Sequence, residues 1–133
     1  MKKIISVKEI ELKEIQRSIA ELSLRAMNVK REIDSTKKEL QALREFLPQT
    51  PIEAQLISEA FKNKKENLRR LEEELAEIET EMEKLKEKLA QKRGELNLIE
   101  ELSRRKEREK RKREELLNER FIYEVLFSGS SDS

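Results

Sequence analysis

The sequence predicts an all-α protein, a two-helix antiparallel coiled-coil hairpin whose C-terminal helix is the longer of the two. Three observations predict it: 44% of the residues are charged and 4% aromatic, apolar residues recur at alternating steps of three and four along two long stretches, and one short proline-containing break separates them. Strict periodicity argues against disorder, the other interpretation of a highly charged chain. At 133 residues, we expect a single domain.

The first helix is expected over about residues 6–47. Ser6 and Glu9 have the spacing of a capping box, and Ile5 and Ile10 are placed to form its hydrophobic staple. The apolar series that follows is termed the seam of the helix, and its heptad spacing over this length favours a coiled coil. The seam consists of Leu12, Ile15, Ile19, Leu22, Ala26, Val29, Ile33, Leu40, Leu43 and Leu47, with Lys8 and Thr36 as polar members.

The turn between the helices is expected at residues 48–50. Pro48 disfavours helical geometry in the residue before it. Thr50 and Glu53 have the spacing of a second capping box, with Pro51 at the first helical position. So short a connection joins antiparallel neighbours. We expect the apolar tip residues to pack together and close the hairpin: Phe46, Leu47, Ile52 and Leu56.

The second helix is expected over about residues 51–127. Its seam consists of Ile57, Phe61, Leu68, Leu71, Leu75, Ile78, Met82, Leu85, Leu89, Leu96 and Ile99, interrupted by Lys64 and Lys92. Folding the chain at Gln49 places four pairs of seam residues opposite each other: Leu47 with Ile57, Leu43 with Phe61, Leu22 with Met82, and Ile5 with Ile99. The seam fades near Leu102, where the first helix runs out of partners. Because each seam can bury its apolar residues against the other seam of the same chain, we expect a monomer.

Residues 103–127 are expected to form a helical overhang about 40 Å long. Pairs four residues apart support its helicity: Glu101 with Arg105, Glu107 with Arg111, and Glu109 with Arg113. The overhang carries a basic run, residues 104–113, and then an apolar cluster of Leu116, Leu117, Phe121, Ile122, Tyr123, Val125, Leu126 and Phe127. Residues 128–133 are expected to be a flexible tail.

Composition argues against catalysis. The chain has no His and no Cys, and its two glycines, Gly94 and Gly129, are isolated, so the usual bases, nucleophiles, zinc ligands and phosphate-binding loops are missing. We expect no enzyme activity, cofactor, metal or small-molecule substrate. Charged residues from Lys8 onward interrupt any signal-peptide pattern, and no apolar run could span a bilayer, so a cytoplasmic protein is expected.

Two surfaces are candidate contacts. Thirty basic and 29 acidic residues leave a net charge of +1, so only local charge can matter. The basic run could meet an acidic protein or remain a solvated helix, since Glu107 and Glu109 are interleaved in it; nucleic acid is the least favoured partner. The apolar cluster has no partner in the hairpin, which favours a protein contact over a frayed end.

This layout resembles the FliJ family, the small coiled-coil component of the flagellar type III export ATPase complex. The resemblance covers nearly the whole chain, and three segments carry it: Lys92 to Leu96, Leu102 with Arg104–Arg113, and Glu119 to Val125. Members often have an Asp-Glu pair near the C-terminus, where this chain has Tyr123-Glu124.

The resemblance implies a stalk that inserts its terminal end into a hexameric export ATPase ring (FliI-like), contacts an export gate protein (FlhA-like) and receives export chaperones. The membrane would be reached through partners only. The ring-binding residues carried over are Arg104, Arg105, Arg108, Arg111, Arg113, Phe121, Ile122, Tyr123, Val125, Leu126 and Phe127. The gate-binding residues carried over are Lys30, Lys37, Lys38, Gln41, Lys65, Asn67 and Arg70.

A prefoldin-like holdase chaperone, a structural coiled-coil scaffold and a nucleic-acid-binding arm are the alternatives. Prefoldin subunits need strand hairpins, for which a three-residue connection leaves no room. An RNA-binding arm would carry basic residues along both helices, whereas here they concentrate in residues 104–113. No residue excludes a scaffold.

Overall fold

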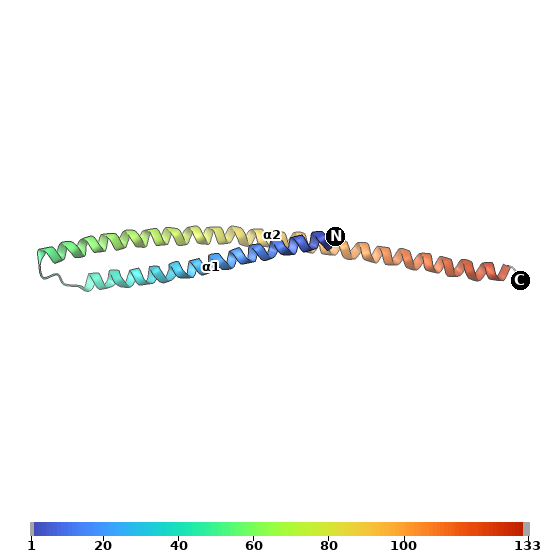
Figure 1. Cartoon of the computed structure of the whole chain (residues 1–133), viewed down its shortest axis with the longest axis horizontal. Helices are drawn as coiled ribbons and strands as arrows, with labels where there is room; N and C mark the ends of the chain where they lie inside the picture. Colours follow the sequence, from blue (N-terminus) through green and yellow to red (C-terminus); the bar gives the residue numbers. More distant parts are fainter. Residues whose placement is uncertain (1, 132–133) are drawn as a thin grey trace. The chain divides into compact units, whose positions relative to one another are not determined.

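The computed structural model describes residues 2–131, with side chains described through residue 127. Over this range the chain forms two α-helices and no strand: α1, Lys2–Glu45, and α2, Pro51–Ser131 (Figure 1). The all-helical prediction is therefore confirmed, and the two helices pack against each other. Contacts divide the chain into unit 1, Met1–Glu11 with Gln91–Ser133, and unit 2, Leu12–Ala90.

Residues of the two predicted seams form the core of unit 2. The central cluster consists of Leu22, Ala26, Val29, Ile33, Leu71 and Ile78, with Leu68, Leu75, Met82 and Leu85 packed against it. Thr36, the polar seam member, is buried, and its hydroxyl donates to the Glu32 carbonyl oxygen at 2.8 Å. This bond to the preceding helical turn satisfies a hydroxyl that would otherwise be costly to bury.

Ion pairs give the direction of the helices in unit 2. Lys64 on α2 bonds Glu39 near the end of α1, and further along α2 Glu74 lies 4.0 Å from Arg25, nearer the start of α1. The residue numbers of the partners therefore decrease along α1 as they increase along α2, so the two helices run in opposite directions. The blue-to-cyan and green-to-yellow ribbons of Figure 1 show the same.

The helix pair has two sides, one lined by residues that directly precede seam residues and the other by residues that directly follow them. Arg25 and Glu74, which directly precede seam residues, meet on one side. On the other side a groove is lined by residues that directly follow seam residues, together with seam residues Ala26 and Met82: Ser23, Met27, Lys30, Glu79, Glu83 and Lys86. A residue's place relative to the seam therefore tells which side of the pair it faces.

The paired part of unit 1 is centred on two lysines. Lys8 Nζ lies 3.2 Å from Glu95 Oε2 and 3.7 Å from Glu11 Oε2. Lys92 Nζ lies 3.5 Å from Glu11 and 3.9 Å from Glu95. The hydrogen bond to Glu95 raises the pKa of Lys8, and nearby carboxylates add to the effect while desolvation opposes it. Lysine stems can thus cover apolar surface while their ammonium groups remain paired.

The predicted start of the first helix is wrong. α1 begins at Lys2, so Ser6 lies inside the helix and cannot cap it. The staple is absent as well, because Ile10 is 58% exposed. Ile5 instead is half-buried in unit 1, as is Ile99, the residue predicted to face it. Burying Ile5 in unit 1 stabilises the extra turn at the start of α1.

The predicted end of the first helix and the predicted closure of the tip are also wrong. α1 ends at Glu45, before Leu47, whose side chain is 83% exposed and so forms no layer with Ile57. Pro48 explains the early end, since its ring opposes a helical conformation in the preceding turn and it donates no hydrogen bond. The other apolar residues of the tip are exposed too: Phe46, Ile52 and Leu56.

The predicted second capping box is present in a shifted form. The Glu53 N–H donates to Thr50 Oγ1 at 3.1 Å, as predicted, whereas Glu53 Oε2 accepts from the Gln49 N–H at 2.9 Å and not from Thr50 itself. At the other end, α2 continues through Ser131, so the predicted flexible tail is wrong for residues 128–131, since extending an existing helix costs little. Residues 132–133 of that prediction lie outside the described residues.

Substituting Thr50→Ala is expected to lower the free energy of unfolding by about 1 kcal/mol, because it removes the side-chain acceptor for the Glu53 N–H. Urea denaturation followed by circular dichroism measures the change. Thr80→Ala is the matched control, since the Thr80 hydroxyl bonds a carbonyl inside the helix and Ala is the better helix former there. Equal losses in both variants would contradict a capping role for Thr50.

Candidate partner-binding surfaces

The last turns of α2 in unit 1 expose an apolar surface, here named the apolar end and defined as residues 116–127. Eight apolar side chains in it are between 51% and 67% exposed: Leu116, Leu117, Phe121, Ile122, Tyr123, Val125, Leu126 and Phe127. The Tyr123 and Phe127 rings are 4.2 Å apart, centre to centre, and tilted by 34° to one another. Exposed apolar surface of this density is characteristic of a contact surface.

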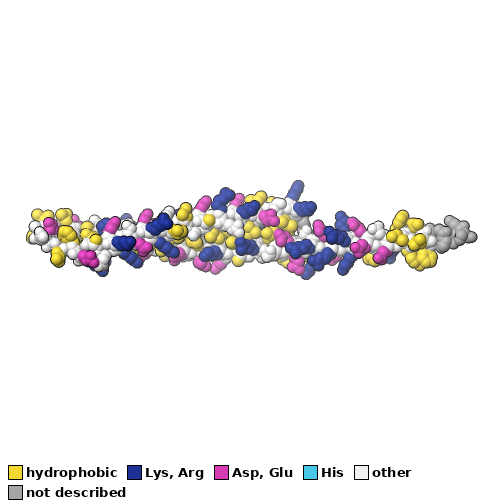
Figure 2. All heavy atoms as spheres, turned by 90° about the horizontal axis from the view of Figure 1, so that it is seen from below, with side chains coloured by type: hydrophobic (Ala, Val, Ile, Leu, Met, Phe, Trp, Pro, Cys, Tyr) yellow, Lys and Arg dark blue, Asp and Glu magenta, His cyan; other side chains and the backbone are white. Residues whose placement is uncertain are grey.

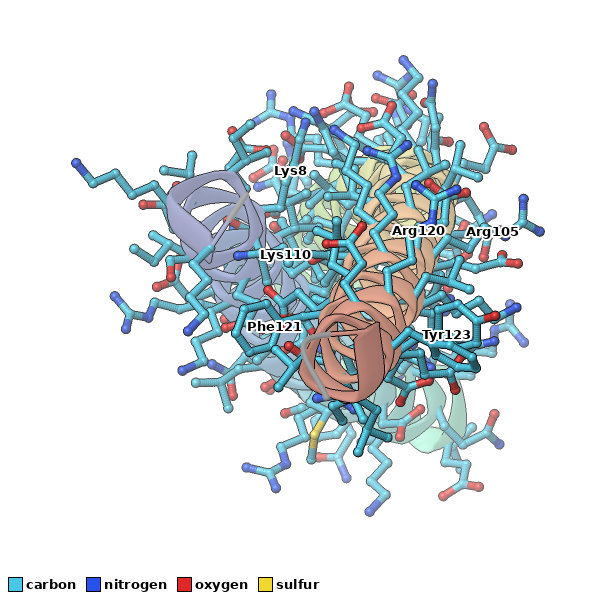
Figure 3. The ribbon with its side chains drawn as sticks, turned by 90° about the vertical axis from the view of Figure 1, so that its right-hand side faces the viewer. Lys8, Arg105, Lys110, Arg120, Phe121 and Tyr123 are labelled. Carbon is cyan, nitrogen blue, oxygen red and sulfur yellow. The ribbon has the colours of Figure 1, made fainter. Side chains whose placement is uncertain are left out.

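The apolar side chains of the apolar end point in all directions around α2. At 3.6 residues per turn, side chains of the apolar end fall on three sides of α2. Leu116, Tyr123 and Phe127 share the first; the second carries Leu117, Phe121 and Val125, and the third Ile122 and Leu126. Figure 3 shows Phe121 and Tyr123 projecting to opposite sides of α2. A flat partner would cover only one of these sides.

The basic run, residues 104–113, is exposed along its whole length and precedes the apolar end. It holds eight Lys or Arg and two Glu, and Figure 2 shows the dark-blue side chains beside the yellow apolar end. Arg105 bonds Glu101 at 2.9 Å, as predicted, and Arg104 lies 3.8 Å from Glu100. Figure 3 shows Arg105 and Lys110 pointing to opposite sides, so the charge also surrounds the helix.

Two predicted ion pairs of the basic run are absent from the described residues. Neither Glu107 with Arg111 nor Glu109 with Arg113 lies within ion-pair distance; the pairs found in this part of α2 involve Arg104 and Arg105 only. Solvated side chains gain little from such pairing, so their separation is physically reasonable. The remaining cations of the run are therefore available to an acidic partner.

The ring-binding residues carried over from the resemblance all lie on these two surfaces, and all are exposed. The gate-binding residues are exposed as well, but they lie on different sides of the helix pair. Lys30, Lys37, Gln41 and Lys65 directly follow seam positions and face the side of the groove. Asn67 and Arg70 directly precede seam residues and face the side of the Arg25–Glu74 pair, and Lys38 lies on the outer surface of α1.

Sequence reasoning missed the groove in unit 2. It passes over Ala26, the smallest residue of the α1 seam, and its apolar lining includes Met27 and Met82. Met27 is half exposed, and its neighbour one turn earlier, Leu24, is 60% exposed. The signal that could have revealed the groove is the single alanine among larger aliphatic residues, because a small seam residue leaves a hollow beside it.

The described residues contain no group of acidic side chains arranged to hold a metal ion. Neither helix, within the described range, has a stretch long and apolar enough to cross a membrane. Comparisons with protein-family models, with curated proteins and with solved structures give no match. The arrangement therefore offers two exposed surfaces on α2, the apolar end and the basic run that precedes it.

Proposed function

We propose that the chain is a coiled-coil hairpin acting as a non-enzymatic stalk of a FliJ-like type III export complex in the cytoplasm. In this proposal its C-terminal part inserts into the pore of a hexameric export ATPase. The apolar end is the anchor inside the ring, and the basic run contacts acidic residues at the entrance.

The observation that carries the proposal is the distribution of apolar side chains around the full circumference of residues 116–127. A helix with apolar side chains on every side can bury all of them only when it is surrounded. A ring of subunits encloses a helix from every side, whereas a groove or a flat surface leaves part of it in water. The basic run adds cations distributed around the helix, which suits a ring of acidic groups.

The gate and chaperone contacts belong to unit 2 in this proposal. The residues facing the groove side are the stronger candidates for the gate protein, because Lys30, Lys37, Gln41 and Lys65 share one side of the helix pair. Asn67 and Arg70 would then contact a different partner or none. Alanine substitution of each set, followed by binding assays with a purified export gate domain, separates the two sides.

The test of the proposal is co-sedimentation with a purified hexameric export ATPase, combined with its ATP turnover. The full-length chain is expected to bind the ring and to raise its turnover. A chain that neither binds nor stimulates any export ATPase tested, while remaining helical by circular dichroism, would show that the stalk proposal is wrong. Binding to a ring without any effect on turnover would limit the proposal to an adaptor.

Neutralising four cations of the basic run is expected to slow ring binding. Replacing Arg104, Arg105, Arg111 and Arg113 by Gln should lower the association rate about tenfold at low salt, because electrostatic steering is lost. The affinity of the variant should also depend less on salt. Stopped-flow or surface plasmon resonance measurements at several salt concentrations give both quantities.

A matched control keeps the change in net charge but moves it to unit 2. Lys13, Arg17, Lys84 and Lys88 are exposed and belong to no ion pair among the described side chains. Replacing these four by Gln should leave the association rate near that of the native chain. If both variants slow binding equally, net charge rather than the basic run governs the encounter.

A further inference from the structure

One side of the apolar end has the features of an interface between helices. Leu116, Tyr123 and Phe127 lie on this side, where the Tyr123 and Phe127 rings contact each other. A shallow hollow there is lined by Leu116 and Tyr123, with charged side chains at its rim: Glu119, Arg120 and Glu124. An apolar strip with a rim of both charges is suited to another helix with the opposite order of charges.

A second copy of the same chain offers that order when it runs antiparallel. If two apolar ends are aligned about Ile122, Arg120 of each copy lies opposite Glu124 of the other, and two-fold symmetry repeats the ion pair. Parallel alignment places Glu124 of the two copies on opposite flanks of the contact, so the Arg120–Glu124 pairs do not form there. These two ion pairs form in the antiparallel arrangement.

The basic run selects the same arrangement. With antiparallel apolar ends, the two copies' Arg113 residues are about 27 Å apart along the axis, from 1.5 Å per residue. This exceeds the Debye length of about 10 Å at 0.1 M salt. Parallel ends would place the eight cations of one run beside the eight of the other, and like charges at close range are strongly unfavourable.

We propose that a second copy of this chain covers the Leu116–Tyr123–Phe127 side of the apolar end in an antiparallel, two-fold arrangement. The contact involves about three helical turns of each copy. The area that it buries is therefore smaller than the roughly 1,200–2,000 Å² of a stable interface. The chain is therefore monomeric at low micromolar concentration and dimeric only near millimolar concentration. The dimer and an enclosing partner use the same surface, so each excludes the other. The inference does not depend on which partner that is.

Sedimentation equilibrium of the full chain alone tests the inference. The average mass should rise from that of one chain towards twice that value as concentration approaches about 1 mM. Tyr123→Asp should weaken association at least tenfold. Ile122→Asp is the matched control, since Ile122 is similarly exposed but lies on another side of the helix. A monomer at every concentration, or equal weakening by both substitutions, would overturn the inference.

The predicted ion pair between Arg120 of one copy and Glu124 of the other can be tested independently. Arg120→Glu and Glu124→Arg should each weaken the dimer several-fold, and the double substitution should restore it, because both ion pairs are rebuilt in reverse. Failure of the double variant to recover would count against the proposed alignment.

Label distances report the orientation. The chain lacks cysteine, so Ser103→Cys accepts a single spin label. Labels about 57 Å apart are expected for the antiparallel dimer and about 10 Å for a parallel one; the shorter distance would overturn the proposal. None of these measurements involves the ATPase, so their outcome is separate from that of the stalk proposal.

Discussion

Deleting residues 121–133 is expected to abolish binding to the export ATPase ring and any stimulation of its turnover, while the paired helices stay folded. The deletion removes six of the eight exposed apolar side chains of the apolar end. Buried aromatic anchors dominate the energy of protein interfaces, so the loss should exceed about 100-fold in affinity. Co-sedimentation and ATPase assays measure the effect.

The same deletion should hardly change the thermal unfolding of the helix pair. None of the deleted residues whose side chains are described is buried, and the core residues of both units lie outside the deleted segment. Deleting residues 128–133 alone is the matched control, because it shortens the chain and keeps the apolar end. A 121–133 deletion that still binds and stimulates normally would place the ring-binding site elsewhere.

Leu71→Asp is expected to have the largest effect on stability. Leu71 is 7% exposed and belongs to the central cluster of unit 2, together with Ile33, which the predicted register places opposite it. The substitution removes apolar packing and leaves a carboxylate there without a cationic partner. The two effects together should cost about 3–5 kcal/mol. Thermal or urea unfolding followed at 222 nm measures the loss.

Leu24→Asp is the control for this prediction, since it makes the same change at a leucine of unit 2 that is 60% exposed. Its effect should stay within about 0.5 kcal/mol. A melting curve unchanged by Leu71→Asp would show that Leu71 does not lie in the core and that the register is wrong.

The sequence predicted the core of the fold well because heptad spacing fixes which side of a long helix is apolar. Every predicted seam residue except Leu47 is buried or half-buried, including the polar members Lys8 and Thr36. The cap at Thr50 was also predictable, because a hydroxyl, a proline and a glutamate at set positions have few other uses. These signals are local and repeat many times.

The predictions of the helix ends are wrong where two local signals in the sequence compete. At Ser6 a cap signal competed with burial of Ile5, and burial determined the start of α1. At Leu47 the heptad favoured burial, whereas Pro48 ended the helix first. The sequence predicted that the candidate site residues are exposed, because exposure follows from the seam of one helix alone. It did not predict the division of Lys30 and Asn67 between two sides, because that depends on how the two helices pair.

The lysines of the α2 seam have a mechanical consequence. Lys64 and Lys92 each reach a glutamate that directly precedes a seam leucine of α1. Sliding the helices by one heptad would bring Lys64 to Glu32 but Lys92 to Ile4, and sliding the other way would leave both without a carboxylate. No slip of one repeat keeps both ion pairs, so the two lysines favour the native register. A push or a twist applied to one helix would have to break both pairs before the helices could slide past each other by one repeat.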